Sequence, residues 1–230
     1  MRISCVQDQL SRGLAIVGRA VGSRTTMPIL GNVLITTDGE RLRLVATNLE
    51  LGITTWVPAR VLEEGRATVP ARLLSEFVNS LPAGRDVSID GGERGAPLRL
   101  ECERIGANVK GVDPEEFPPV ATGDDRPAVR IPAREFRSMI DQVAFCAARD
   151  ESRPVLSGVN VRMEGTVLSL AAADGFRLAI RTAELDHGLP EALDVIIPAR
   201  ALTELGRLLG GDDDEVEVSV TGNRTQVLFR

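Results

Sequence analysis

Short runs in which hydrophobic and polar residues alternate recur along the chain, and turn residues separate them. Alternation with a period of two is typical of a strand with one buried and one exposed face. The runs at 33–37, 41–45, 87–89 and 216–220 therefore predict half-buried antiparallel strands. Asp38 with Gly39, and Gly222 with Asn223, lie between such runs and are typical of hairpin turns.

A second pattern places hydrophobic residues three or four positions apart and predicts amphipathic helices at about 7–21, 71–81, 133–147 and 199–209. The expected buried stripe of the first helix is Leu10, Leu14, Val17 and Val21. The expected stripe of the second is Leu73, Leu74, Phe77 and Leu81. Two helices and many antiparallel strands in each half of the chain predict an α+β layered fold.

Three sequence blocks occur twice in the same order, at a nearly constant offset of 126–128 residues. The blocks that begin at Met27, Leu42 and Val69 are echoed by blocks that begin at Arg153, Leu168 and Ile197. Because chance does not keep three blocks in register, we interpret the chain as two copies of one module. A stretch rich in proline and acidic residues, 113–127, marks the boundary. The predicted modules are therefore 1–122 and 123–230.

The composition is that of a folded globular protein. Of the 230 residues, 43% are hydrophobic and 26% are charged, and no apolar run approaches the ~18 residues that span a membrane. The amino terminus lacks the apolar core of a signal peptide. Three dispersed cysteines and one histidine disfavour a disulfide framework and a zinc site. We therefore expect a soluble cytoplasmic protein without metal or cofactor.

The distribution of positive charge is unusual for an acidic chain, whose net charge is −6. Almost all of the positive charge is arginine, and Lys110 is the only lysine. The codon bias of a GC-rich genome is one explanation for this preference. Three predicted helices nevertheless open with Pro-Ala-Arg. Proline suits the first helical position, and the arginine that follows, Arg72, Arg134 or Arg200, falls in the first turn. A cation there is disfavoured by ~0.3–1 kcal/mol, because the helix dipole is positive at that end.

The helical arginines lie off the apolar stripes. Helical spacing puts them on the faces opposite the predicted core: Arg12, Arg19, Arg72, Arg134, Arg137, Arg200 and Arg207. Ordinary pairs four residues apart, Arg72 with Glu76 and Arg200 with Glu204, are the structural alternative. The functional interpretation is loose contact with a polyanion backbone.

Support for catalysis is weak. His187 stands alone in a polar loop, and the acidic run 212–215 carries no metal-ligand spacing. No nucleophile-elbow, P-loop or dinucleotide motif is present. We predict no catalytic residue. A non-catalytic protein-interaction scaffold and a small hydrolase that uses Asp174 are carried as alternatives.

Several blocks together resemble the bacterial β sliding clamp, the processivity subunit of the replicative DNA polymerase holoenzyme. They are 24–33, 46–50, 69–72, 149–156 and 174–179, and they lie in the family's order over the whole chain. The resemblance implies a DNA-clamp fold in which two chains of three domains each close a ring around double-stranded DNA. It also implies a non-catalytic protein whose helices line the hole.

The resemblance further implies two kinds of site. Arg24 matches a DNA-contact position of the family, and Arg149 lies in the corresponding loop of the second module. A pocket that docks short peptides of the polymerase, the clamp loader and repair polymerases corresponds to Leu156, Ala173, Gly175, Phe176, Arg177 and Leu178. The alternative for Phe176 and Leu178 is a place in the core. The third clamp domain is absent from the sequence. We therefore expect a monomer here, and a homodimer for a full-length chain.

Overall fold

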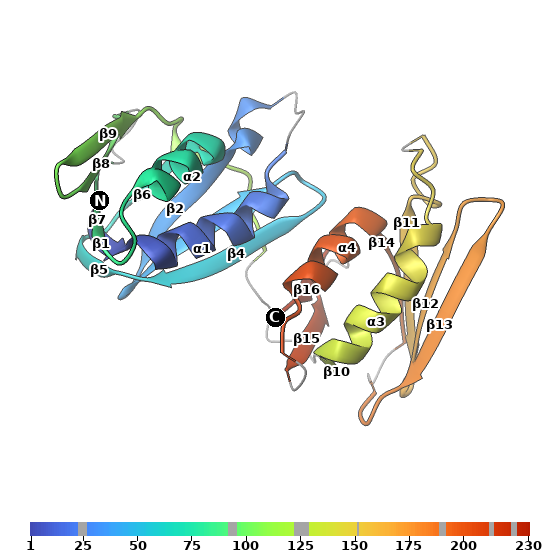
Figure 1. The fold of residues 1–230 in the computed structure, drawn as a ribbon. Helices are drawn as coiled ribbons and strands as arrows, with labels where there is room; N and C mark the ends of the chain where they lie inside the picture. Colours follow the sequence, from blue (N-terminus) through green and yellow to red (C-terminus); the bar gives the residue numbers. More distant parts are fainter. Residues whose placement is uncertain are drawn as a thin grey trace. The chain divides into compact units, whose positions relative to one another are not determined.

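The structure, a computed structural model, describes residues 1–22, 27–91, 96–121, 129–150, 152–188, 192–211, 214–221 and 225–230. Contacts between residues divide the chain into two compact units, Met1–Val120 and Ala121–Arg230, coloured blue to green and yellow to red in Figure 1. Each unit has its own layers of helix and sheet. The two units are described separately below.

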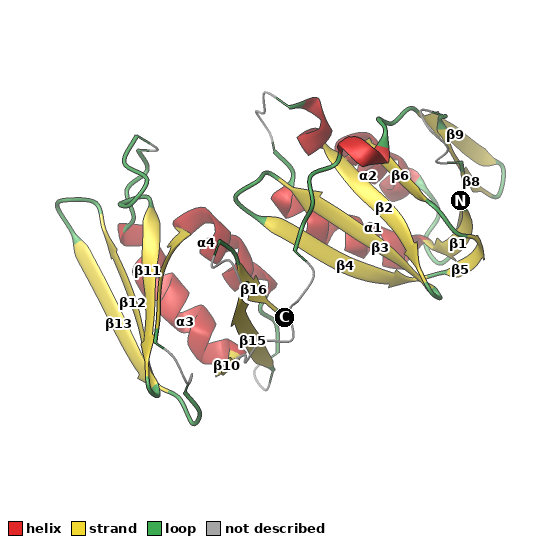
Figure 2. Ribbon diagram, turned by 180° about the vertical axis from the view of Figure 1, so that it is seen from behind, coloured by secondary structure: helices red, strands yellow, loops and turns green. Residues whose placement is uncertain are grey.

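The first unit contains two antiparallel sheets in its described residues. One has the strand order β5 (Arg60–Glu63), β1 (Arg2–Val6), β7 (Asp86–Asp90), β8 (Leu98–Cys102), β9 (Ile105–Val109). The other has the order β4 (Gly52–Pro58), β3 (Arg41–Thr47), β2 (Asn32–Asp38), β6 (Arg66–Pro70). Helices α1 (Gln7–Val17) and α2 (Ala71–Ser80) pack against each other, and α1 also covers β3 and β4. Figure 2 shows this layering from behind.

The second unit repeats this topology. Strands β13 (Leu178–Glu184), β12 (Val167–Ala173), β11 (Gly158–Glu164) and β14 (Leu193–Pro198) form a four-stranded sheet in the same relative order as β4-β3-β2-β6. Strands β10 (Val129–Pro132), β15 (Glu215–Val220) and β16 (Val227–Phe229) form the other sheet. Helices α3 (Ala133–Val143) and α4 (Ala199–Leu208) lie side by side. The sequence repeat therefore has a structural counterpart.

The interior of the second unit is continuous from helix to sheet. Phe136, Met139 and Ile140 of α3 are almost completely buried, and they belong to one cluster with Leu170 of β12 and Leu202 of α4. These residues occupy the inward-facing positions of the helical and strand patterns, so burial of their apolar surface holds the helix pair on the sheet. The opposite helix faces are left to solvent.

All four α-helices begin where the sequence pattern predicts, at residues 7, 71, 133 and 199. The expected role of the prolines is wrong in detail. Pro70, Pro132 and Pro198 are not the first helical residues but the N-caps, with extended ψ angles of 116–128°. Each proline is also the last residue of a strand, so strand and helix join without a loop. Each arginine is thus the second residue of its helix.

The predicted helix ends are too late in two places. After α1 and α3 the chain continues as the 3₁₀ turns Gly18–Ala20 and Ala144–Cys146, whose tighter hydrogen bonding commonly ends helices. One stripe residue is also misplaced: Leu73 of α2 is 55% exposed, and the buried residues of that helix are Ala71, Leu74 and Val78. The hairpin predicted at Gly222 and Asn223 lies outside the described residues.

The remaining sequence features are surface or core elements. All three cysteines are buried and free, and His187 is exposed. Among the described residues, no cluster of three or more potential metal ligands is found. Within the same ranges, no helix is long and apolar enough to cross a membrane.

Candidate DNA-facing helices and partner-docking turn

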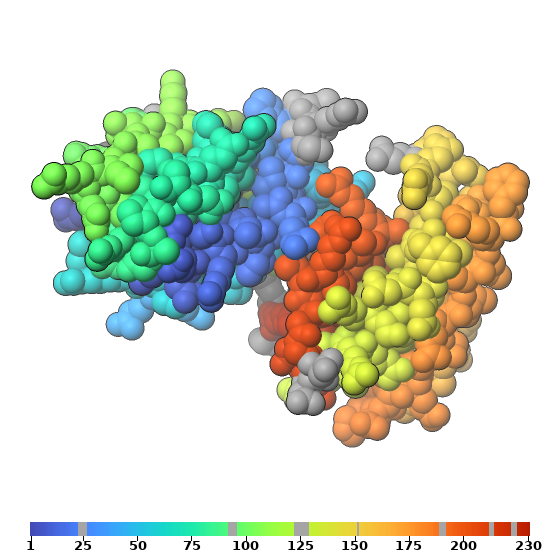
Figure 3. All heavy atoms as spheres, in the orientation of Figure 1, coloured from blue at the N-terminus to red at the C-terminus, as the bar shows by residue number. Residues whose placement is uncertain are grey.

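The helical arginines that the sequence analysis singled out are exposed. Arg72 of α2, Arg134 and Arg137 of α3, and Arg200 and Arg207 of α4 all lie on the solvent side of their helices. Figure 3 shows the side chains of α3 and α4 forming one surface of the second unit. Arg149 is exposed as well, shortly after α3. Arg24 lies outside the described residues.

Two of these arginines have acidic partners. Nε of Arg72 lies 2.7 Å from Oε1 of Glu76, so the structural alternative of an i,i+4 pair is realised on α2. This hydrogen bond and the charge of Glu76 raise the pKa of Arg72. On α4, however, Glu204 bonds to Arg207 at 2.5 Å and not to Arg200. The expected pair of Arg200 with Glu204 is therefore not formed.

Other arginines on these surfaces are left open. With the other residues that the structure describes, Arg134, Arg149 and Arg200 form no ion pair or side-chain hydrogen bond. Their guanidinium groups donate to no side chain among the described residues, and such N–H donors match the geometry of phosphate oxygens. Arg134 and Arg200 also occupy first-turn positions, where the backbone N–H groups of a helix favour an anion.

An open groove lies beside α3. It has a volume of about 340 Å³, and its lining includes Arg134, Arg137, Ser138, Gln142 and Leu209. Nη1 of Arg137 donates to the backbone carbonyl of Leu209 at 3.5 Å. Because Leu209 is the C-cap of α4, Arg137 places a cation at the negative end of that helix. It therefore links the two helices as well as contributing charge.

Five of the six residues of the predicted docking pocket lie at the turn between β12 and β13, and the sixth, Leu156, lies just before β11. Leu156 and Ala173 are half-buried, and Gly175 has a φ of +95°, which glycine adopts at no steric cost. Phe176 is 94% exposed and Leu178 is 66% exposed. The alternative that these two residues fill the core of this unit is therefore wrong.

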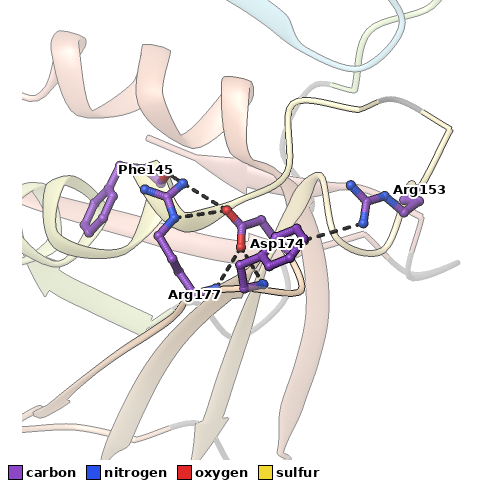
Figure 4. Close-up of polar contacts among 5 residues, drawn as sticks. Phe145, Arg153, Asp174 and Arg177 are labelled. Atoms are coloured by element: carbon purple, nitrogen blue, oxygen red, sulfur yellow. Dashed lines mark hydrogen bonds and ion pairs between the residues drawn. The ribbon is translucent and has the colours of Figure 1, made fainter.

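Asp174 organises the turn. Its Oδ1 accepts hydrogen bonds from the backbone N–H groups of Phe176 at 2.9 Å and of Arg177 at 2.8 Å. Its Oδ2 pairs with the guanidinium of Arg177 at 3.0 Å (Figure 4). The two backbone hydrogen bonds are the main reason that the pKa of Asp174 is lowered to about 2. A carboxylate held ionised in this way is a poor general acid or base at neutral pH, which weighs against the hydrolase alternative.

Two further side chains join this arrangement. The Arg177 guanidinium lies 5.8 Å from the ring centroid of Phe145, and its Nη2 donates to the Phe145 carbonyl at 3.4 Å. Nη1 of Arg153 donates to the carbonyl of Asp174 at 3.4 Å (Figure 4). Sequence reasoning missed these contacts. The spacing of Asp174 to Phe176 is typical of an Asx turn and could have indicated the backbone bonds; no sequence signal indicated Phe145.

Solved structures define the class of fold. A DNA polymerase sliding clamp from Bacillus subtilis superposes with a TM-score of 0.93 at 29% identity, over 100% of this chain and 62% of that one. The Caulobacter crescentus pol III beta structure gives a TM-score of 0.90 at 28% identity, over 100% and 63%. The predicted α+β DNA-clamp fold is confirmed.

The family follows from sequence. The DNA polymerase III beta subunit, N-terminal domain, matches residues 1–121, and the DNA polymerase III beta subunit, central domain, matches residues 130–230. The beta sliding clamp of a Synechocystis strain is 36% identical over the whole chain. The chain therefore belongs to the DNA polymerase III beta subunit family, as the resemblance implied. It spans about 63% of the length of that relative.

Proposed function

We propose that this chain is the DNA-encircling and partner-docking part of a sliding clamp, a non-catalytic protein that tethers the replicative DNA polymerase to duplex DNA. A bacterial clamp works in the cytoplasm, where the chromosome lies. The observation that carries the proposal is the exposure of arginines on the helix pairs of both units, in a chain of net charge −6.

Charge segregation supports contact with DNA. A protein that binds DNA through a compact site usually needs a strongly basic surface. A clamp that holds DNA by enclosure needs only weak phosphate contacts, which also let it slide. Arg134, Arg149 and Arg200 have the required exposure, and within the described ranges none of them has an ion pair. We expect Arg72 and Arg207 to contribute less, because Glu76 and Glu204 compensate their charge.

The exposed turn of the second unit supports docking of short peptides. Phe176 and Leu178 present apolar surface beside Arg177, and Gly175 lets a partner backbone approach closely. We propose that the polymerase, the clamp loader and repair polymerases use this surface. A full-length protein of the family would act as a homodimer ring.

The test is the salt dependence of binding between the 230-residue chain and a fluorescein-labelled DNA duplex, beginning at low salt. Each lost phosphate contact reduces the slope of log K against log salt by about 0.9. The double variant Arg134→Ala/Arg200→Ala is expected to lose two such contacts, which lowers the magnitude of the slope by nearly 2. Arg60→Ala on β5, an exposed strand position, is the control and should leave the slope unchanged.

A loss in slope for Arg60→Ala half as large as that of the double variant would contradict the proposal, because the attraction would then follow the number of charges removed and not the helix surface. A slope that neither change alters favours the scaffold of the same fold that never encircles DNA.

A further inference from the structure

The sheet β4-β3-β2-β6 has one face against α1, and a connecting segment covers part of the other face. Leu44 of β3 lies close to Gly13 of α1, so its neighbour Val45 points away from that helix. Val45 is nevertheless only 1% exposed. It belongs to a buried cluster that consists of Ile29, Leu30, Val45 and Phe117. Phe117 comes from residues 111–120, which follow β9 and cross this face of the sheet (Figure 2), and we call them the strap.

The strap is fixed to the sheet near both of its ends. Near its start, the backbone N–H of Val112 donates to Oγ1 of Thr68 on β6 at 3.1 Å. Near its end, Val120 lies so close to β4 that a Cβ added to Gly52 would meet Cγ1 of Val120 at 2.8 Å. The strap therefore reaches from one edge strand of this sheet to the other.

The internal repeat shows what the strap covers. At the offset of 126 residues that relates the two units here, Leu30 corresponds to Leu156 and Gly52 corresponds to Leu178. Leu156 and Leu178 are two residues of the predicted docking pocket. Leu30 packs in the cluster with the strap, and Gly52 lies against the last residue of the strap. In the first unit, the strap thus covers positions that correspond to the docking pocket of the second.

The same positions are buried in one unit and exposed in the other. Ile29 is 5% exposed in the first unit, whereas its counterpart Val155 is 66% exposed in the second. Val45 is fully buried in the first unit, and its counterpart Ala171 is only half-buried. An apolar face of this kind marks an interaction site where it is exposed. In the first unit, the chain supplies the interacting segment itself.

We propose that this face of the first unit is a latent docking surface, and that the strap occupies it in place of a partner. The peptide that fits has the chemistry of the strap itself: it is extended and carries a phenylalanine anchor with an acidic residue shortly before it. Phe117 is 8% exposed in the cluster, and Glu115 pairs with Arg66 of β6. The comparison with the docking pocket rests on the proposed function, whereas the strap and its contacts do not.

Covalent attachment explains why the strap excludes other peptides. A tethered segment acts at an effective concentration in the millimolar range, so a free peptide at micromolar concentration displaces little of it. Pro114, Pro118 and Pro119 restrict the strap before it docks, which lowers the entropy cost of docking. A free peptide binds only the fraction of chains in which the strap is released, and its apparent affinity is reduced by that fraction. Weakening the strap should therefore open the surface.

The experiment weakens the strap and supplies its sequence as a separate peptide. The probe is a synthetic peptide with the sequence of residues 111–120, and a second peptide carries alanine in place of its phenylalanine. Each is titrated into the ¹⁵N-labelled 230-residue chain, and the NMR shift of the Val45 amide reports binding to the first unit. Phe117→Ala removes the anchor of the strap, and Val120→Ala is a smaller truncation at its end. Leu62→Ala, an exposed position on β5 outside the strap, is the matched control.

Phe117→Ala is expected to bind the phenylalanine peptide at the first unit at least about 10-fold more tightly than the unchanged chain does, because more of its strap is released. Val120→Ala should gain about 3-fold, and Leu62→Ala should gain nothing. An equal affinity of Phe117→Ala and the unchanged chain overturns the proposal, and so does a gain that the alanine peptide shares. Where Phe117→Ala does not fold, Val120→Ala gives the same decision.

Shifts in the second unit separate this inference from the proposed docking function. The amides of Gly175 and Phe176 report the predicted docking pocket, which none of these variants changes. Shifts there with none at Val45 in Phe117→Ala mean that the docking function stands and the latent surface does not. Shifts at Val45 in Phe117→Ala with none at Gly175 and Phe176 mean that the latent surface stands and the docking function fails for this peptide.

Discussion

Gly13 of α1 packs closely against the sheet of the first unit, and replacing it with alanine tests that approach. An added Cβ would lie 2.6 Å from Cγ2 of Val57 and 2.9 Å from Cδ1 of Leu44. Both neighbours are completely or almost completely buried strand residues. Val57 is β-branched and stiff about χ1, so it cannot turn its methyl group away cheaply. The helix must therefore shift outward or the strand must yield.

The magnitude follows from two opposing effects. Overpacking a filled core costs about 1–3 kcal/mol. Alanine in place of glycine in a helix interior stabilises by up to about 1 kcal/mol. Because the closer contact is to a stiff side chain, we expect packing to dominate, with a net loss of about 1 to 2 kcal/mol in the free energy of unfolding.

The assay is urea unfolding followed by the emission of Trp56, the single tryptophan, which lies on β4 next to Val57. The matched control is Gly206→Ala in α4, where the new Cβ would lie 3.5 Å from Cγ2 of Ile140, an ordinary contact. That variant should gain up to about 1 kcal/mol, measured by circular dichroism. A midpoint for Gly13→Ala at or above that of the unchanged chain would refute the close approach.

Two further predictions concern ionisation. Burial, reinforced by Asp86, raises the pKa of the Cys5 thiol to about 12, so a disulfide reagent should label no cysteine in the native chain and all three after unfolding. Because the folded-state pKa exceeds the ordinary value, the contribution of Cys5 to stability is full below pH 9 and should fall as the pH rises toward 12. Rapid labelling of Cys5 in the native chain would contradict this prediction. The pKa of Asp174 is lowered, so its effect on stability has the opposite pH dependence. The ionised carboxylate contributes fully to stability above about pH 4, and this contribution is lost as the pH falls toward 2. The difference in urea midpoint between the unchanged chain and Asp174→Asn should therefore shrink over that window, and a constant difference would contradict the role of the charge.

Local sequence signals predicted where the helices begin better than where they end. Pro70, Pro132 and Pro198 mark the helix starts because proline cannot donate to the strand ladder and its fixed φ suits a helix entry. No comparable residue marks the helix ends, where α1 and α3 tighten into 3₁₀ turns. Leu73 was misplaced because Leu73 and Leu74 are adjacent, and the hydrophobic pattern alone does not decide which of them faces the sheet.

The candidate sites were predicted as residues but not as contacts. Helical periodicity was sufficient to place Arg200 and Arg207 on the exposed face of α4. It could not decide which of them pairs with Glu204, because one lies four residues before and the other three residues after, and side-chain rotamers make the choice. The contact of Arg177 with Phe145 joins residues 32 positions apart, so it depends on tertiary packing.

The positions of the ion pairs show how an acidic chain keeps a cationic surface. Two exposed strand arginines are compensated by a carboxylate two residues away on the same strand: Arg99 by Glu101 and Arg162 by Glu164. Arg134 and Arg200 have no such partner among the residues that the structure describes. We therefore expect these two strand arginines to compete weakly for phosphate and the open helix arginines to attract it more strongly. Since exposed charges are screened within about 8–10 Å at physiological salt, each contact stays weak, and for the proposed clamp that weakness lets DNA move through the ring while enclosure holds it.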